Sequence, residues 1–184
     1  MAKVVILSGS PRAGGNTDDC ASYVARELTA AGHGVDTVRL ADCRIEPCRG
    51  CRACTKLGHC AVSGDDFERV WGAVAKADFV VMAAPVYWLG PPGVTKNFID
   101  RTHGYYAAGR PLRGLKAALL SVAADDGCWE PHERVASSWL ECYGAEMLPP
   151  LRIRAREKGQ AMGSPEALKR LDGWVADLLK SLPK

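Results

Sequence analysis

The sequence predicts a three-layer α/β domain, in which a doubly wound, five-stranded parallel sheet has the strand order 2-1-3-4-5. Three observations support this prediction. Short apolar runs alternate with segments of helical periodicity along the 184 residues. The run at 79–84 is continuously apolar, which is typical of a central parallel strand buried on both faces. Glycine-rich or polar loops follow the first, third and fourth runs, at the edge where such a sheet binds its ligands.

The first half of the chain supplies three strands and two helices. A short apolar run indicates each strand, and apolar residues three and four positions apart indicate each helix. Glycines at 32 and 34 end the first helix, and Asp65 or Asp66 is the expected N-cap of the second. In order, the predicted elements are the strand at 4–7, the helix at 18–31, the strand at 35–40, the helix at 67–77 and the strand at 79–84.

The second half continues the alternation. Pro92 can open a helix because a proline in the first turn loses no helical hydrogen bond. Pro149 and Pro150 interrupt the fifth strand, which suits the edge of a sheet. Ser164 as N-cap and Pro165 at the next position begin the last helix. The other predicted elements are the helix at 94–101, an irregular excursion at 103–111 that forms a subunit contact or the site's rim, the strand at 116–123, the helix at 131–143 and the strand at 145–153.

Length and composition narrow the function classes. We expect one domain over 1–184, with a cysteine-rich insertion loop at about 41–65. The net charge of +3 is small and scattered, so nucleic acid is not an expected partner. The first apolar run is too short for a signal-peptide core or a spanning helix, so we expect no membrane and a cytoplasmic location. In that compartment the eight cysteines are metal ligands, redox groups or buried thiols rather than disulfides.

The segment at 8–17 is a glycine- and serine-rich turn from the first strand into the first helix. Such a turn leaves backbone N–H groups free at the positive end of the helix dipole, which makes an anion site. Hydroxyls of Ser10 and Thr17 and the amide of Asn16 add donors, and Arg12 adds charge. The segment therefore predicts a site for a monophosphate, as in a flavodoxin-like fold.

Two other phosphate motifs fit the segment less well. A nucleotide-binding P-loop requires a lysine where Gly15 stands. A dinucleotide fingerprint requires a glycine where Pro11 stands, although Asp42 could imitate its ribose-binding acid. A turn that only connects two elements is the remaining alternative.

Two further loops follow strands at the same edge of the predicted sheet. The loop after the third strand begins with Pro85, Val86, Tyr87 and Trp88. It should lie beside the loop after the first strand, so an isoalloxazine ring fits against its two aromatics; core packing of these aromatics is the alternative. The loop at 124–129, after the fourth strand, lies on the same side.

Cys48, Cys51, Cys54 and Cys60 form the pattern C-x2-C-x2-C-x5-C. Steps of three residues span at most about 10 Å, so these four thiolates can reach one centre. Structural zinc more often uses two separated pairs of ligands, whereas cysteines at consecutive two-residue gaps are typical of a four-iron cluster. Zinc, and free or reversibly oxidised thiols, are the alternatives.

Other residues bear on this cysteine pattern. Cys43 could replace Cys48 as a ligand, and His59 could compete with Cys60. Basic side chains within the segment would offset the negative charge of a cluster; they are Arg49, Arg52 and Lys56. Three cysteines elsewhere are expected to be ordinary buried or partly buried thiols: Cys20, Cys128 and Cys142.

Three stretches together resemble the iron–sulfur flavoproteins within the family of NAD(P)H-dependent FMN reductases. The resemblance covers about the first 125 residues. The stretches are Gly-Ser-Pro-Arg-x-Gly-Gly-Asn-Thr at 9–17, the four-cysteine pattern followed by two aspartates at 65–66, and Pro-Val-Tyr-Trp at 85–88 with Lys-Asn-Phe-Ile-Asp-Arg at 96–101.

The resemblance implies bound FMN, a [4Fe-4S] cluster on the four cysteines, and assembly as a homodimer or homotetramer. It implies a role for each loop at the sheet edge. Ser10, Arg12, Asn16 and Thr17 would hold the FMN phosphate, Pro85 to Trp88 would line the isoalloxazine, and Ala124, Asp125 and Gly127 would approach its pyrimidine edge.

The predicted function is an oxidoreductase in which NAD(P)H reduces the flavin. Electrons then leave through the cluster, or in pairs, to a small acceptor such as a quinone or to a redox partner. The flavin carries the chemistry, so no side-chain acid or base is required and no catalytic residue is named. The alternatives are a cluster-free NAD(P)H:quinone or FMN reductase with structural cysteines, and a non-enzymatic flavodoxin-like electron carrier.

Overall fold

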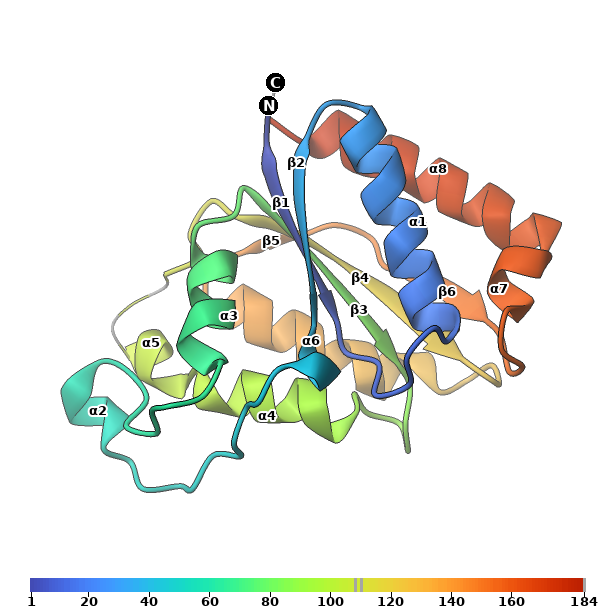
Figure 1. The fold of residues 1–184 in the computed structure, drawn as a ribbon. Helices are drawn as coiled ribbons and strands as arrows, with labels where there is room; N and C mark the ends of the chain where they lie inside the picture. The colour runs from blue at the N-terminus through green and yellow to red at the C-terminus, as the bar shows by residue number, and fades with distance from the viewer. Residues whose placement is uncertain (108, 110, 184) are drawn as a thin grey trace.

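The computed structural model describes residues 1–107, 109 and 111–183. Its sheet has the order β2-β1-β3-β4-β5, and β6 also pairs with β4 (Figure 1). Every strand pair in this sheet is parallel, so the predicted doubly wound α/β fold and the order 2-1-3-4-5 are confirmed. The strands are β1 (Lys3–Ser8), β2 (Gly34–Arg39), β3 (Phe79–Pro85), β4 (Lys116–Ala123), β5 (Glu146–Met147) and β6 (Leu151–Arg154).

Helices cover both faces of the sheet and make the outer two of three layers (Figure 1). Alternate residues of β1 point to opposite faces: Val4 and Ile6 pack with α1 and α8, and Val5 and Leu7 pack with α3, α4 and α6. The helices are α1 (Asn16–Ala30), η1 (Leu40–Asp42, a 3-10 turn), α2 (Cys54–Leu57), α3 (Phe67–Ala75), α4 (Gly93–Arg101), α5 (His103–Ala107), α6 (Trp129–Cys142), α7 (Gln160–Gly163) and α8 (Pro165–Ser181).

The fifth strand is an edge strand, as predicted, but it is split. Met147 pairs with Ala117 and Leu151 with Leu120, and between them Pro149 and Pro150 make no strand pairing. Proline has no backbone N–H to donate to a neighbouring strand, which explains the break between β5 and β6.

Three short helices were not predicted. The expected irregular excursion begins with the helix α5, whereas Ala108 and Arg110 of that excursion lie outside the described residues. The cysteine-rich segment contains α2, and the linker after β6 contains α7. Each of the three has at most five residues, too few to show helical periodicity in a sequence.

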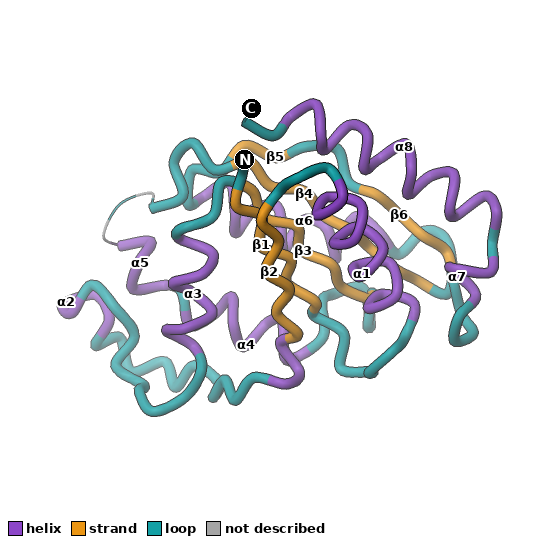
Figure 2. Tube along the Cα trace, turned by 45° about the horizontal axis from the view of Figure 1, so that its top comes forward, coloured by secondary structure: helices purple, strands orange, loops and turns teal. Residues whose placement is uncertain are grey.

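The topology determines where a site can form. The connection from β1 runs to β2 on one side, and β3 lies on the other side of β1. The strand order therefore reverses between β1 and β3, and ligands of such sheets bind at the carboxyl ends of these strands. Figure 2 shows α1, α7 and the loops near them at one end of the molecule, with α2 far from them at the other end.

Within the described ranges, no helix is both long enough and apolar enough to cross a membrane.

Candidate functional site

A cavity of about 270 Å³ lies where the loops after β1, β3, β4 and β6 meet. It brings together most of the residues predicted from the sequence. The predicted residues that line it are Ser10, Arg12, Asn16, Thr17, Pro85, Val86, Tyr87 and Ala124. The lining residues that were not predicted are Gly15, Val122, Ala123, Ala155, Arg156 and Lys158.

The loop after β1 is held in shape by its own hydrogen bonds. The Ser10 hydroxyl accepts from the Arg12 backbone N–H at 3.2 Å and donates to the Arg12 carbonyl at 3.1 Å. Gly14 has a φ of +57°, a left-handed conformation that glycine adopts without strain. Gly9 has no room for a side chain, because a Cβ there would lie 2.1 Å from the Thr95 hydroxyl. The loop is therefore a preformed cradle that presents the exposed Arg12 side chain.

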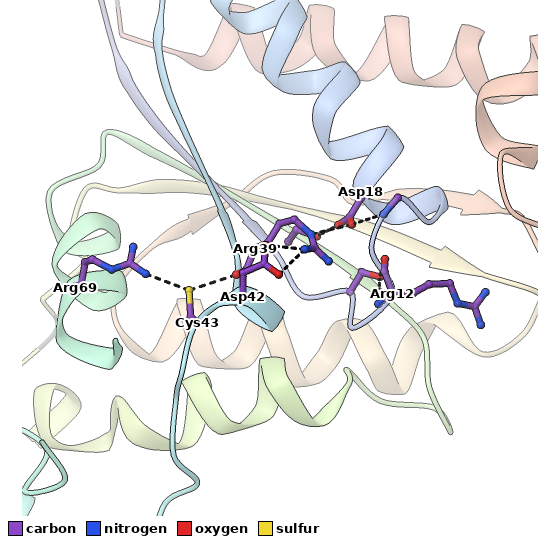
Figure 3. Close-up of polar contacts among 9 residues, drawn as sticks. Arg12, Asp18, Arg39, Asp42, Cys43 and Arg69 are labelled. Atoms are coloured by element: carbon purple, nitrogen blue, oxygen red, sulfur yellow. Dashed lines mark hydrogen bonds and ion pairs between the residues drawn. The ribbon is translucent and has the colours of Figure 1, made fainter. Parts of the chain in front are cut away.

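The buried carboxylate of Asp18 stabilises this loop by hydrogen bonds. Asp18 accepts from the Ser8 hydroxyl at 2.5 Å and from the Gly14 N–H at 3.1 Å. The Arg39 guanidinium neutralises it, with Nε 2.9 Å from an Asp18 oxygen, and also bonds Asp42 (Figure 3). The hydrogen bond to Asp42, with the nearby Asp18 charge, raises the pKa of Arg39 despite its burial.

The same network reaches the start of the cysteine-rich segment. The Cys43 thiol donates to the Arg39 carbonyl at 3.3 Å and accepts from Arg69 at 3.3 Å (Figure 3). Polar contacts thus connect the segment's first cysteine to the residue that neutralises Asp18.

Asn16 begins α1, and its side-chain amide, which we expected to bind the phosphate, instead bonds a distant part of the chain. Its amide nitrogen donates to the Glu157 carbonyl at 2.8 Å, and its amide oxygen accepts from the Ala161 N–H at 3.1 Å. The Asn16 nitrogen thus connects α1 to the loop between β6 and α7, and its oxygen connects α1 to α7 itself. The first N–H groups of α1 still lack partners inside the helix, so the anion site predicted from the turn is available at the backbone of Asn16 and Thr17.

The loop after β3 makes a tight hairpin at the edge of the cavity. Tyr87 and Gly90 pair as an antiparallel bridge, and the two residues between them have φ of 48° (Trp88) and 64° (Leu89). Tyr87 lines the cavity, whereas Trp88 is fully exposed and is not among the lining residues. In the loop after β4, Ala124 lines the cavity; Asp125 instead pairs with Arg156 at 2.6 Å, and Gly127 also lies outside the lining.

A second, larger cavity of about 780 Å³ is lined by Cys48, Cys51, Cys54 and Cys60. Its other walls come from α4, α5 and α6 and include apolar surface of Trp139. All eight cysteines are free thiols. Among the described residues, no three His, Cys, Asp or Glu side chains are gathered closely enough to hold a metal ion. The four cysteines therefore face one cavity without converging on one point.

Cys142 differs from our expectation of a buried or partly buried thiol. It is exposed at the end of α6 and lines the cysteine cavity, so a fifth thiol faces the same space. Of the other two, Cys20 is buried, which raises the pKa of its thiol to about 12, and Cys128 is half-buried.

Arg101, the last residue of α4, anchors the base of the cysteine-rich segment. Its Nε donates to the Cys60 sulfur at 2.9 Å, and its two terminal nitrogens bond Asp65 at 2.6 and 3.3 Å. The same nitrogens donate to the carbonyls of Glu46 at 3.0 Å and Val62 at 2.7 Å. One buried side chain therefore holds both ends of the segment and donates to Cys60, one of the four thiols predicted as cluster ligands.

Asp65 or Asp66 was expected as the N-cap of α3; Asp66 stands at that position without a side-chain capping bond, and Asp65 has two other roles. Its carboxylate accepts from the Phe67 N–H at 3.2 Å, in the first turn of α3, and pairs with Arg101. Burial alone would raise the pKa of Asp65, but the bonds from Arg101 and from the Glu46 and Phe67 backbone lower it. Asp65 is therefore a carboxylate at neutral pH.

Comparison with known proteins agrees with this geometry. The profile of the NADPH-dependent FMN reductase family matches residues 2–150. An iron–sulfur flavoprotein of Archaeoglobus fulgidus is 34% identical over 144 residues, which cover 74% of this chain and 63% of that protein. An iron–sulfur flavoprotein of Methanosarcina thermophila is 28% identical over 143 residues, which cover 77% of this chain and 74% of that protein. The chain thus spans less than two thirds of the Archaeoglobus relative.

A solved structure shows the same fold over a longer range. The apo form of an NADH:FMN oxidoreductase superposes with a TM-score of 0.75 at 17% identity and covers 100% of this chain and 91% of its own. The sequence match and the parallel sheet order agree, and we conclude that this chain belongs to the NADPH-dependent FMN reductase family, on the branch that contains the iron–sulfur flavoproteins.

Proposed function

We propose that this chain is an FMN-dependent oxidoreductase that takes electrons from NAD(P)H. The observation that carries the proposal is the cavity at the carboxyl ends of β1, β3, β4 and β6, which lies at the start of α1. Free N–H groups at the start of α1, the Thr17 hydroxyl and the Arg12 guanidinium belong to residues that line it, a donor set that suits a phosphate dianion.

Each loop has a proposed task in binding FMN. The backbone at Asn16 and Thr17, with Ser10 and Arg12, would hold the phosphate. Bound FMN would supply the hydride-accepting ring, and the protein would bind and orient it. The segment from Pro85 to Trp88 would flank that ring, and the loop containing Ala124, Asp125 and Gly127 would approach its pyrimidine edge.

The cysteine cavity fits a proposed [4Fe-4S] cluster in its chemistry. Cys48, Cys51, Cys54 and Cys60 supply four thiols to one space, and Arg101 donates an N–H bond to the Cys60 sulfur. An N–H bond to a ligand sulfur stabilises its thiolate form and so supports the binding of such a cluster. When bound, the cluster would accept single electrons.

The partners are proposed at the level of chemical class. A small-molecule electron acceptor such as a quinone, or a redox protein, would take the electrons, and the chain would act as a homodimer or homotetramer in the cytoplasm.

A steady-state assay separates an enzyme from a carrier. We expect the pure protein with FMN to oxidise NAD(P)H over many turnovers when an acceptor quinone is present. A single stoichiometric reduction without turnover would indicate an electron carrier instead.

Iron and acid-labile sulfide analysis of protein purified without oxygen tests the cluster. We expect about four irons per chain in the wild type, and loss of this iron in Cys51→Ala because one of four ligands is removed. Cys128→Ala is the matched control, since Cys128 lies outside the cysteine cavity and should leave the iron content unchanged. Flavin bands without iron would favour the cluster-free reductase.

A further inference from the structure

A second basic side chain faces the proposed phosphate site from a distant part of the sequence. Lys158 follows β6 and lines the same cavity as Ser10, Arg12 and Thr17. Its ammonium lies close to the glycine-rich loop, since a Cβ on Gly14 would be 3.5 Å from Lys158 Nζ. The carboxyl ends of β1 and β6 therefore bring three basic side chains to one small cavity: Arg12 from one loop, and Arg156 and Lys158 from the other.

Lys158 differs from its basic neighbours in its ion pairing. In the part of the chain that the structure describes, no carboxylate lies within ion-pair distance of it, whereas its neighbour Arg156 pairs with Asp125 at 2.6 Å. Arg154 pairs with Asp126 in the same way. Lys158 is therefore the basic residue of this loop whose charge is available to a ligand.

The loop that carries Lys158 is fixed in place rather than free. The two bonds from the Asn16 amide reach Glu157 and Ala161, so they bracket Lys158 on both sides. The Gln160 side chain accepts from the backbone N–H groups of Arg156 at 2.7 Å and Glu157 at 3.1 Å. Both views show α7 beside the first turn of α1 (Figures 1 and 2). The position of Lys158 is thus set by the residue that begins α1.

We propose that Lys158 is a second cationic ligand of the FMN phosphate, opposite Arg12, and that the Asn16 side chain is a positioning residue that holds the Lys158 loop against the site. The inference rests on the proposed binding of FMN in this cavity. A phosphate monoester carries close to two negative charges at neutral pH, so it can use a cation on each side. The amide of Asn16 then acts through Lys158, and only its backbone N–H faces the phosphate.

Titration with FMN and with riboflavin, which lacks the phosphate, tests the proposal. Flavin fluorescence quenching would give both affinities for the wild type and for Lys158→Met. We expect Lys158→Met to weaken FMN binding about tenfold and to leave riboflavin binding unchanged. Lys169→Met removes the same charge from the exposed side of α8, away from the cavity, and should change neither affinity.

A double-mutant cycle tests the role of Asn16. We expect Asn16→Ala to weaken FMN binding several-fold in the wild-type background and by less than twofold in the Lys158→Met background. A merely structural role of Asn16 would lower affinity equally in both backgrounds. Unfolding in urea verifies that each variant is folded before titration.

The outcomes separate this inference from the proposed function. If the wild type binds neither flavin, the proposed function fails. If the wild type prefers FMN to riboflavin but Lys158→Met retains that preference in full, only the inference about Lys158 is overturned. Equal weakening of both flavins by Lys158→Met would also overturn it, because a phosphate ligand cannot affect riboflavin.

Discussion

Arg101 uses its whole donor capacity inside the protein. A guanidinium has five N–H donors, and here they bond Cys60, both oxygens of Asp65 and the carbonyls of Glu46 and Val62. Its side chain is 0% exposed, and that of Asp65 is 2% exposed. A fully satisfied buried ion pair adds little net stability over an apolar pair, but removing one partner leaves a buried charge without compensation.

We therefore predict that Arg101→Met lowers the free energy of unfolding by about 3–5 kcal/mol. Urea denaturation at neutral pH measures the change. Arg101→Lys keeps the charge but has only three donors, so it should lie between the wild type and Arg101→Met. Arg26→Met removes an exposed arginine that pairs with Glu27 and lies over the Tyr23 ring, and it should cost less than about 1 kcal/mol.

The same ion pair gives this prediction a pH dependence. Asp65 has a lowered pKa in the folded protein, so its contribution to stability is full above the unfolded pKa of about 4. That contribution is lost as the pH falls through the folded pKa. The stability gap between the wild type and Arg101→Met should therefore be largest near neutral pH and should narrow in acid. A gap that is constant with pH would contradict the assigned ion pair.

At the scale of elements, the hairpin at 87–90 carries backbone strain beside the candidate site. Trp88 and Leu89 have φ of 48° and 64°, the signs that a two-residue type I′ turn requires at both central positions. Asn and Gly favour these positions, whereas a Trp and a Leu there cost about 1–2 kcal/mol each. Strain of this kind is often kept where a loop must present a side chain to a ligand.

We predict that the double variant Trp88→Asn, Leu89→Gly raises the free energy of unfolding by about 1–2 kcal/mol. It should also weaken flavin binding if Trp88 flanks the ring, so stability and binding would change in opposite directions. Urea unfolding and flavin titration of one preparation give both values. The control, Trp88→Ala with Leu89→Ala, removes the same side chains without relieving the strain; a similar gain there would contradict the turn-strain explanation.

At the scale of the whole molecule, one helix connects the two candidate sites. α4 begins after the hairpin that borders the 270 Å³ cavity, and it ends at Arg101 beside the cysteine cavity. Its nine residues rise by about 14 Å in total. The 270 Å³ cavity therefore lies where the strand order reverses between β1 and β3, and the cysteine cavity lies at the C-terminal end of α4.

The sequence alone could predict the sheet order and most of the loop residues of the site. Continuous apolar runs such as 79–84 and the glycine-rich turn at 8–17 are local patterns, and parallel topology determines which loops meet. Arg156 and Lys158 could also have been found, because they follow a parallel strand at the same edge, although the predicted site did not include them. The break in the edge strand was signalled by its two prolines.

Other features depend on contacts that no local pattern contains. Asn16 was expected to use its amide on a ligand, yet its partners lie about 140 residues away. Arg101 belongs to a recognisable motif, but its four partner residues come from a segment at 46–65 whose path only the fold reveals. Likewise, Cys142 joins the cysteine cavity only because α6 packs beside it.

The most direct test of the central claim is the affinity of Arg12→Ala for FMN, compared with riboflavin. Arg12 is exposed at the cavity and is not needed for the loop's internal bonds, which use its backbone. A charge-assisted bond to phosphate is worth about 1.5–3 kcal/mol, so we predict that FMN binding weakens about 10- to 100-fold while riboflavin binding is unchanged. Unchanged FMN affinity in Arg12→Ala would contradict the placement of the phosphate at this loop.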